Sequence, residues 1–474
     1  MKILLTGSTG YIAQRLLPVL LANRHEVVCC VRDRNRFNFE KYNSPSISVI
    51  EVDFLKPETL RVIPTDIDAA YYLIHSMSTS TGDFEKMEEA SAINFRDYIQ
   101  QSKASQVIFL SGIINEENLS KHLSSRRNVE WILASGSYSL TTLRAGIIIG
   151  SGSASFEIIR DLVEKLPVMI APRWLNTVSQ PIAIRNVIEF LSGVLLNKNT
   201  FNNSYDIGGP DIMTYKQMLL KFAEVRRLRL WIGIVPVMTP KLSSYWLFFI
   251  TSTSYSLAQK LVDSMKVEVI CKENDLKGML GIIPVSYEDA IKEAFERIEL
   301  NQVPSSWKDA LTSSTLYDGI SKYAEVPVHG CFLDYRKRLI PHPEKALLKI
   351  WSIGGKNGWY YGDWLWIIRG FIDKLFGGVG LRRGRKNQTE ISPGEALDFW
   401  RVLIADRRAK RLLLFAEMKL PGEAWLEFRI DDQNILHQTA TFRPLGLWGR
   451  LYWYSVLPFH GFIFRGMIKN IADG

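Results

Sequence analysis

The chain opens with a glycine-rich segment, MKILLTGSTGYIA, that restricts how its first residues can fold. The apolar run ILL is typical of a short buried strand, and a helical pattern begins at Ala13. Between them, Gly7 allows a sharp turn, and Gly10 lets the backbone approach an anion without a Cβ atom in the way. Backbone N–H groups and the positive end of a helix dipole converge at such a turn. The segment therefore predicts a βα unit that binds the pyrophosphate of a dinucleotide.

Strand-like and helix-like segments alternate over the first 210 residues. Residues 83–102 have the spacing of an amphipathic helix. Five apolar runs predict strands, at residues 26–32, 46–52, 69–74, 106–111 and 140–143. This alternation is typical of an α/β Rossmann fold, a doubly wound parallel sheet. We expect a first domain over residues 1–300, in which residues 211–300 form a small substrate-side subdomain.

The composition changes near residue 330. Residues 331–474 contain 23 Lys and Arg against 14 Asp and Glu, so they hold the whole net charge of +9, and they hold eight of the 13 tryptophans. Residues 458–471 predict a closing helix. An antiparallel sheet is predicted by residues 399–404, 411–418, 424–430 and 435–442. We therefore expect a linker over 301–330 and an α+β domain over 331–474.

The basic C-terminal domain has three interpretations, which the sequence leaves open. Its basic cluster, Arg382, Arg383, Arg385 and Lys386, could bind an anionic head group or phosphate, rest on a membrane surface, or form a solvated face. No RNA-binding motif is present, so we expect no nucleic acid partner. The histidines and cysteines lack metal-ligand spacing, so we expect no metal.

The sequence predicts a cytoplasmic protein. No stretch reaches the roughly 18 uncharged apolar residues that a membrane-spanning helix needs. The first strand begins within two residues of Met1, so we expect no signal peptide.

Arg32 follows the second predicted strand, where a fold selective for NAD usually carries an acidic residue for the ribose hydroxyls. A guanidinium instead pairs with a 2′-phosphate, and Arg34 and Arg36 follow closely. We therefore expect NADP(H) to be preferred over NAD(H). Asp53, after the third strand, has two interpretations: it accepts a hydrogen bond from the adenine amino group, or it is an acid near a helix N-terminus.

The order TGSTGYIA, VRDR, VIEVDF, AYYLIHS, VIFLSG, TTLRAGIIIG and YDIGGP resembles the short-chain dehydrogenase/reductase superfamily. It is similar to the extended and atypical branches, which include NmrA-like proteins and the complex I accessory subunit. The whole layout resembles bacterial atypical reductases fused to a domain of unknown function. That second domain is similar to the START/polyketide-cyclase helix-grip fold, which encloses apolar ligands in other families.

This resemblance implies roles for particular residues. Ser111 stands where the family keeps its catalytic serine, and Arg32 is placed on the 2′-phosphate. The other implied cofactor-binding residues are Gly7, Thr9, Gly10, Tyr11, Ile12, Ala13, Asp53, Phe54, Leu73, Ile74, His75 and Ala145.

The sequence departs from the family at the acid. The family places a tyrosine and a lysine four residues apart on one helix face, so that the cation lowers the pKa of the phenol. At this spacing the chain has His122 and Arg126. His122 could supply a proton and Arg126 could hold a ribose hydroxyl, or both are ordinary helix residues at a site without proton-transfer chemistry.

Two functions follow from these observations. The first is an NADP(H)-dependent oxidoreductase acting on an apolar small molecule such as a lipophilic carbonyl or a quinone. The second is a non-catalytic NADP(H) sensor or assembly factor, whose C-terminal domain binds a lipid or a protein partner. Aromatic candidates for the substrate end, with core packing as the alternative, are Phe156, Trp174, Trp246 and Phe249.

Overall fold

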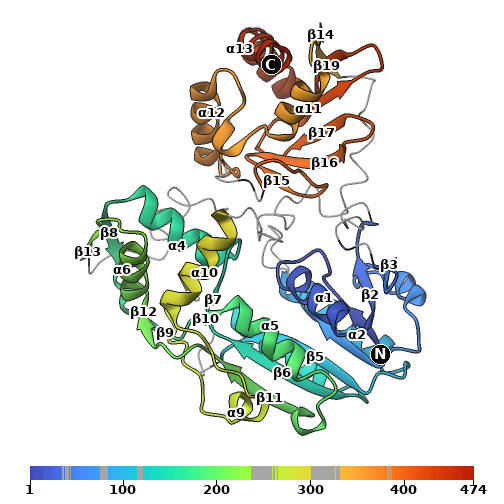
Figure 1. Ribbon diagram of the computed structural model, residues 1–474, viewed down its shortest axis with the longest axis vertical. Coiled ribbons are helices and arrows are strands. Elements are labelled where there is room, and N and C mark those ends of the chain that lie inside the picture. The colour runs from blue at the N-terminus through green and yellow to red at the C-terminus, as the bar shows by residue number, and fades with distance from the viewer. Residues whose placement is uncertain are drawn as a thin grey trace. The chain divides into compact units, whose positions relative to one another are not determined.

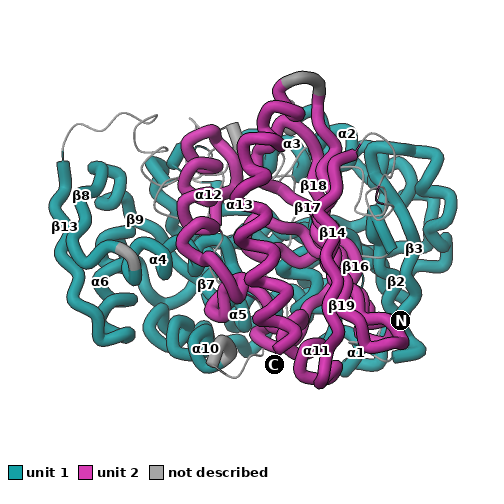
Figure 2. Tube along the Cα trace, turned by 90° about the horizontal axis from the view of Figure 1, so that it is seen from above, with its two compact units in different colours: residues 1–317 teal, residues 318–474 magenta. Residues whose placement is uncertain are grey.

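The computed structural model of the chain describes residues 1–34, 37, 42, 44–74, 84–114, 121–235, 259, 262, 263, 265–299, 326, 331–381, 385 and 387–473. The chain divides into two compact units, Met1–Tyr317 and Asp318–Gly474 (Figure 2). Of the predicted linker, only Val326 lies within the described residues, so the boundaries 1–300 and 331–474 stay predictions.

A seven-stranded sheet forms the centre of the first unit (Figure 1). All of its neighbouring strands are parallel, which confirms the predicted doubly wound sheet. In order across the sheet, the strands are β11 (Asn203–Ile207), β6 (Ser139–Ala145), β5 (Gln106–Gly112), β4 (Ala69–Tyr72), β1 (Lys2–Leu5), β2 (Glu26–Val31) and β3 (Ile47–Glu51).

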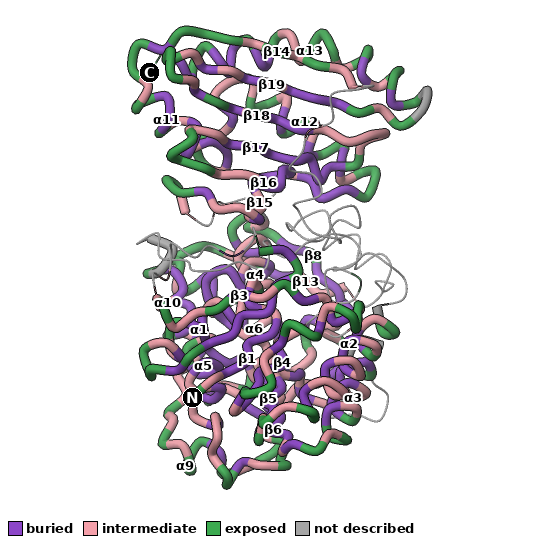
Figure 3. Tube along the Cα trace, turned by 90° about the vertical axis from the view of Figure 1, so that its right-hand side faces the viewer, coloured by how far each residue is buried: buried purple, intermediate pink, exposed green. Residues whose placement is uncertain are grey.

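Helices cover both faces of this sheet. On one face, α1 (Ala13–Ala22) and α5 (Ile184–Gly193) pack in one apolar core with residues of β1 and β2. On the other face, α2 (Phe84–Ile99) and α3 (Lys121–Ala134) pack against each other and share a core with β4 and β5. Figure 3 shows the buried residues that run along the strands between these layers. The parallel strands therefore all end at the same edge of a rigid three-layer core.

A third apolar core in this unit combines segments that lie far apart in the chain. It joins α4 (Ala154–Lys165) and β8 (Val168–Pro172) to α6 (Tyr215–Val225) and α10 (Tyr287–Glu299). The short elements of this region are β7 (Ile148–Ile149), β9 (Val178–Ser179), β10 (Ile182–Ala183), β12 (Met213–Thr214), β13 (Trp231–Val235) and α9 (Leu276–Leu280). The helix α6 starts with a capping box formed by Thr214 and Gln217.

The second unit is built on a six-stranded antiparallel sheet. Together with the long terminal helix α13 (Gly446–Ala472), which packs on β14 (Phe332–Leu339) and β19 (Ile435–Pro444), this arrangement is consistent with a helix-grip-like fold. The remaining helices are α11 (Pro343–Trp351) and α12 (Asp363–Leu375). In order across the sheet, the strands are β14 (Phe332–Leu339), β19 (Ile435–Pro444), β18 (Gly422–Ile430), β17 (Arg411–Ala416), β16 (Trp400–Asp406) and β15 (Ala396–Leu397).

The structure corrects the predicted start of the closing helix. α13 begins at Gly446, not near residue 458, and Pro458 lies inside it. Proline favours the first turn of a helix because it has no N–H to donate, which is why the sequence indicated a start there. In α13, Trp453 stacks on Phe332 and Phe442 of the sheet before Pro458, and Phe464 and Met467 pack in the core after it, so one continuous helix stays packed on the sheet.

Candidate functional site

The turn between β1 and α1 is held against the end of β4. Gly7 has φ +62°, and a Cβ atom on it would lie 2.9 Å from the carbonyl oxygen of Leu73. The Thr6 hydroxyl donates to the carbonyl oxygen of Tyr71 and accepts from the N–H of Leu73, both at 2.9 Å. Only glycine combines this backbone conformation with this approach, so the turn has one fixed shape.

The same turn presents the N-terminus of α1. The Gly10 N–H donates to the carbonyl oxygen of Gly7 at 2.7 Å, and a Cβ atom on Gly10 would lie 2.9 Å from that oxygen. No side chain caps the helix at Ile12, while Ala13 is buried against the sheet. Thr9, Tyr11 and Ile12 are partly exposed. The residues present fit a pyrophosphate, since the helix offers its dipole and first-turn N–H groups to an anion.

Charged residues follow β2 as predicted from the sequence. Arg32 and Arg34 are exposed, whereas Asp33 between them is buried. Arg36 lies outside the described residues. An exposed guanidinium at the carboxyl end of β2 is placed on the strand edge where a dinucleotide fold holds the adenosine ribose.

The residues predicted to contact adenine have local roles in the structure. The Asp53 carboxylate accepts from the N–H of Leu55 at 3.1 Å, and its other oxygen lies 3.9 Å from the Lys56 ammonium. The Phe54 ring packs in the core against Phe95, with ring centroids 5.7 Å apart. Adenine binding by Asp53 and Phe54 therefore stays a prediction.

The residues after β4 lie beside the glycine turn. Leu73 and Ile74 are partly exposed there, and Leu73 supplies the N–H that binds Thr6. His75 lies outside the described residues.

Ser111, the last residue but one of β5, has a buried hydroxyl with no hydrogen-bond partner among the described residues. The next two residues, Gly112 and Ile113, line a cavity of about 200 Å³, as does Ala145 at the end of β6. We call this the strand-end cavity. It opens at the same edge of the sheet as the glycine turn, which is where doubly wound folds bind their ligands.

The strand-end cavity has an apolar lining. Trp174 lines it, and its indole N–H is buried with no partner among the described residues. Tyr215 also lines it, and burial raises the pKa of its phenol. Phe156, in contrast, packs in the core against Phe222 and Phe295. Trp246 and Phe249 lie outside the described residues.

The predicted proton-transfer pair lies on α3. The Arg126 guanidinium is buried, donates to the carbonyl oxygens of Ile74 and Leu110, and lies 3.8 Å from the carboxylate of Glu88. These bonds tie α3 to the ends of β4 and β5. Of His122 only the backbone is described, so the sequence-based role of this residue stays a prediction.

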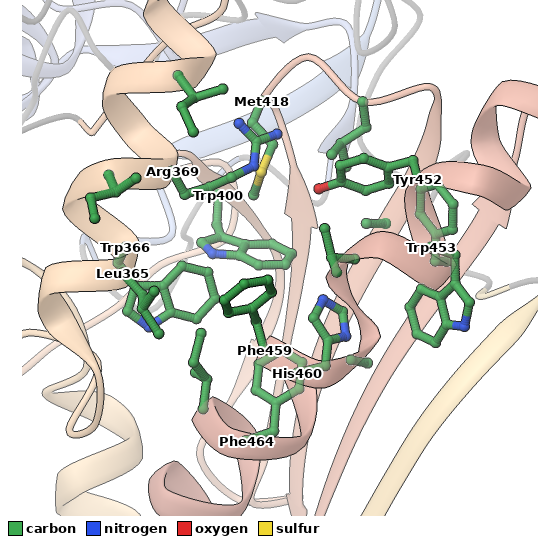
Figure 4. A pocket seen from close by; sticks show the side chains of 18 of the residues that line it. Leu365, Trp366, Arg369, Trp400, Met418, Tyr452, Trp453, Phe459, His460 and Phe464 are labelled. Atoms are coloured by element: carbon green, nitrogen blue, oxygen red, sulfur yellow. The ribbon is translucent and has the colours of Figure 1, made fainter.

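The second unit contains a larger cavity of about 440 Å³. The resemblance to a fold that encloses apolar ligands implied such a site, but no residue of the cavity could be named from the sequence. We call it the C-terminal cavity (Figure 4). α12, α13 and the sheet contribute its aromatic lining, which includes Trp366, Trp400, Trp425, Tyr452, Trp453 and Phe464. The indole N–H groups of Trp366 and Trp400 and the Nδ1 atom of His460 are buried without a partner among the described residues.

The His460 ring lies edge-on to Trp453 and Phe464, with ring centroids 5.0 and 4.9 Å away. Burial lowers the pKa of this imidazole to about 4. Between this value and the usual pKa of about 6.5, the unfolded chain binds a proton that the folded chain excludes. The free energy of unfolding of this unit should therefore fall as the pH falls through this window.

We expect His460 to lower the free energy of unfolding by about 1–2 kcal/mol between about pH 7 and pH 5. A His460→Phe variant keeps an aromatic ring but has no proton to gain, so its pH dependence should be shallower by that amount. Urea unfolding of both proteins at the two pH values checks this. Equal losses in the two proteins would contradict it.

The predicted basic cluster is described only at Arg385. Its guanidinium donates to the carbonyl oxygens of Trp351, Ile353 and Glu390, at 2.5, 3.1 and 3.1 Å. Burial lowers the pKa of this group. Arg385 therefore joins two loops of the second unit, while Arg382, Arg383 and Lys386 lie outside the described residues.

Two further observations concern the described residues as a whole. In this part of the chain no helix is long and apolar enough to cross a membrane. No group of three or more His, Cys, Asp or Glu side chains there has the arrangement of a metal site.

Comparisons with known proteins agree with this architecture. A family model described as NAD(P)H-binding matches residues 7–145, and one described as a protein of unknown function, DUF2867, matches residues 330–467. A comparison with curated proteins gave no match.

Solved structures share the fold of the first unit. A nucleoside-diphosphate-sugar epimerase from Staphylococcus aureus has a TM-score of 0.51 at 16% identity, over 62% of this chain and 100% of that chain. The Bordetella bronchiseptica enzyme WbmG in complex with NAD has a TM-score of 0.50 at 12% identity, over 65% of this chain and 96% of that chain. The chain thus joins an NAD(P)-binding Rossmann-like domain, which shares the fold of these epimerase-like structures, to a C-terminal domain that matches the DUF2867 family model.

Proposed function

We propose that the first unit binds NADP(H) and uses it to reduce a lipophilic carbonyl or a quinone. The observation that carries this proposal is the buried hydroxyl of Ser111, which has no partner among the described residues and directly precedes Gly112 and Ile113 in the wall of the strand-end cavity. A hydroxyl in this position has an unused donor for a substrate oxygen, and an unpaired buried polar group costs free energy unless a ligand binds it.

The nature of the cavity supports an apolar substrate. Its walls are formed by aliphatic and aromatic side chains such as Ile159, Leu162 and Leu219. A sugar ring would leave its hydroxyl groups without partners against these walls, whereas a quinone or an aliphatic ketone needs one or two donors at its oxygens.

Ser111 would then stabilise the charge that develops on the substrate oxygen. Bound NADPH supplies a hydride, and the reduced substrate takes up a proton. The Ser111 hydroxyl donates a hydrogen bond to the oxygen as it becomes negative, which lowers the barrier. Hydride addition to a quinone leaves a delocalised, weakly basic phenolate oxygen, which forms without a positioned acid and takes its proton from solvent afterwards. This substrate class therefore does not require the tyrosine and lysine that the chain lacks.

Arg32 supports the preference for the phosphorylated nucleotide. We expect an Arg32→Glu variant to bind NADPH about tenfold to a hundredfold more weakly, with little change for NADH, because a carboxylate repels a 2′-phosphate. Arg229→Glu, the same charge change at an exposed residue between α6 and β13, is the control and should bind as the unchanged protein does. Tryptophan fluorescence titrations with both nucleotides measure this. Equal affinities of the unchanged protein for NADPH and NADH would contradict the role of Arg32.

Oxidation of NADPH with a panel of quinones tests the reaction itself. Ser111→Ala should lower turnover by about a hundredfold while the affinity for NADPH stays the same. Unchanged turnover in this variant would contradict the role of Ser111.

One observation favours a non-catalytic NADP(H) sensor or assembly factor as a second candidate. Arg126 stands at the position of the family's lysine, and its guanidinium is bound to backbone carbonyls and lies beside Glu88. Tight binding of NADPH without oxidation by any quinone of the panel would support this candidate over the reductase.

A further inference from the structure

We infer that the second unit binds one uncharged, membrane-soluble molecule with a hydrogen-bond acceptor, and that this molecule enters the C-terminal cavity from a membrane surface. The inference concerns a site in the DUF2867 domain and does not depend on the reaction proposed for the first unit.

The cavity has the size and lining of a ligand site. Its volume of about 440 Å³ lies within the range of small-molecule pockets. It is a single space lined by α12, by strands of the sheet and by α13, and aromatic side chains dominate its walls (Figure 4). A flat or polycyclic molecule would bury its faces against these rings.

The polar atoms in these walls define the ligand further. Trp366 and Trp400 are each more than nine-tenths buried, and each has an indole N–H without a partner among the described residues. An indole N–H only donates, so it needs an acceptor such as a carbonyl or ether oxygen. His460 adds an unpartnered Nδ1 atom, and its low pKa keeps the ring uncharged at neutral pH.

Arg369 also lines the cavity, but its guanidinium lies 3.9 Å from the Asp373 carboxylate and donates to the carbonyl oxygen of Lys419. Its charge is thus balanced within the protein, and the wall favours an uncharged ligand with an acceptor.

The mouth of the cavity is apolar as well. Trp364, Ile368 and Ile372 on α12 and Phe459 on α13 line the cavity and are also exposed. On α12 the exposed apolar residues follow the helical repeat, since Ile367, Phe371 and Leu375 continue the same face. Soluble surfaces seldom expose such a continuous apolar face, and here it surrounds the entrance to the cavity.

The charge of α13 favours a lipid surface as the partner of this exposed apolar face. Between Gly446 and Ala472, α13 has no acidic residue, and its exposed Arg450, Arg465 and Lys469 are basic. Exposed aromatic residues on the same helix include Trp448, Tyr454 and Phe462. Aromatic and basic side chains together are typical of the interface of a membrane with anionic lipids.

Binding of the ligand is tested on the full chain with phenylnaphthylamine, an uncharged fluorophore. We expect the chain to bind one molecule of the fluorophore saturably. Methylnaphthoquinone should displace the fluorophore about tenfold more effectively than methylnaphthalene, which lacks the two oxygens. In Trp400→Phe, which keeps the ring but not the N–H, this preference should shrink. Ala440→Trp places a large side chain in the cavity and should lower the affinity for the fluorophore about tenfold or more.

Failure of the fluorophore to bind, or unchanged affinity in a folded Ala440→Trp protein, would overturn the site. If Ala440→Trp does not fold, the Trp400→Phe result decides, because an unchanged preference for the naphthoquinone there removes the assigned donor. No nicotinamide takes part in these measurements, so their failure is distinct from failure of the proposed reaction.

Membrane uptake is tested by sedimentation with vesicles of phosphatidylcholine and phosphatidylglycerol. The full chain should sediment with them, and Ile368→Glu combined with Ile372→Glu should remain in solution. Leu348→Glu, at an exposed apolar residue of α11 that does not line the cavity, is the matched control and should sediment normally. The assigned entrance would be overturned if both variants, or neither of them, lost sedimentation with the vesicles. If the α12 face binds a protein instead, the unchanged chain would not bind the vesicles.

Discussion

Gly7→Ala is expected to lower the affinity of the protein for NADPH by about tenfold to a hundredfold. The added Cβ atom would lie 2.9 Å from the carbonyl oxygen and 3.2 Å from the carbonyl carbon of Leu73, so the turn must move away from β4. Both sides of this contact are backbone, which cannot rotate away as a long side chain does. The first-turn N–H groups of α1 would then no longer converge on the pyrophosphate.

Gly281→Ala provides a matched control for this variant. Gly281 has φ +63°, almost the same as the +62° of Gly7, but no atom lies within 4 Å of a Cβ atom built on it. Both variants should therefore lose about 1 kcal/mol of stability from the left-handed backbone, and only Gly7→Ala should lose the nucleotide. Calorimetric titration with NADPH, together with thermal unfolding, separates the two effects. Equal NADPH affinities in the two variants would contradict a phosphate site at this turn.

Removal of the Glu417 carboxylate should destabilise the second unit by about 3–5 kcal/mol. Arg401 and Glu417 form a fully buried ion pair, with one guanidinium nitrogen 2.9 and 3.0 Å from the two carboxylate oxygens. Arg401 also donates to the carbonyl oxygen of Gly394 at 2.8 Å. Glu417→Leu would leave the guanidinium buried without its counter-charge, and this uncompensated charge accounts for the large loss.

Thermal unfolding followed through the tryptophans of this unit measures the effect, and we expect the melting temperature to fall by about 10 °C. The pair of Arg411 and Glu427 is the control, since these side chains lie 2.6 Å apart on the same sheet but are partly exposed. Glu427→Gln should cost less than about 1 kcal/mol. In the double variant Arg401→Met and Glu417→Leu, much of the loss should be recovered. If the stability losses of the single variants Arg401→Met and Glu417→Leu simply added in the double variant, the two side chains would not be coupled.

The sequence predicted the parallel sheet well because its signals are local. Apolar runs separated by helical spacing indicated β2 to β6 to within two residues at each end, and the glycine turn indicated the start of α1. β14 was not predicted, because its residues FLDYRKRL carry charges typical of an edge strand and lack a continuous apolar face. Pro458 concealed the first turns of α13, since a proline inside a helix is indistinguishable in sequence from one that begins it.

The sequence could predict the candidate site only where a single continuous segment supplies its residues. The turn around Gly7 is such a segment, but the contact with Leu73 that makes glycine necessary comes from β4, more than sixty residues later. The spacing of His122 and Arg126 could not show that the guanidinium binds the ends of two strands. The C-terminal cavity unites α12, the sheet and α13. Apart from the resemblance to a fold that encloses apolar ligands, its signals in the sequence were the eight tryptophans and the apolar spacing of α12.

Isotopic labelling tests whether a hydride passes from bound nicotinamide to a quinone. The full chain would be mixed with NADPH deuterated at the transferable position and with methylnaphthoquinone, and the loss of reduced-nicotinamide absorbance would be followed in a single turnover. We predict a slower decay with the deuterated nucleotide than with the unlabelled one, and a further decrease in Ser111→Ala. Stable absorbance of tightly bound NADPH with every quinone tested would contradict the reductase and leave the nucleotide as a ligand only.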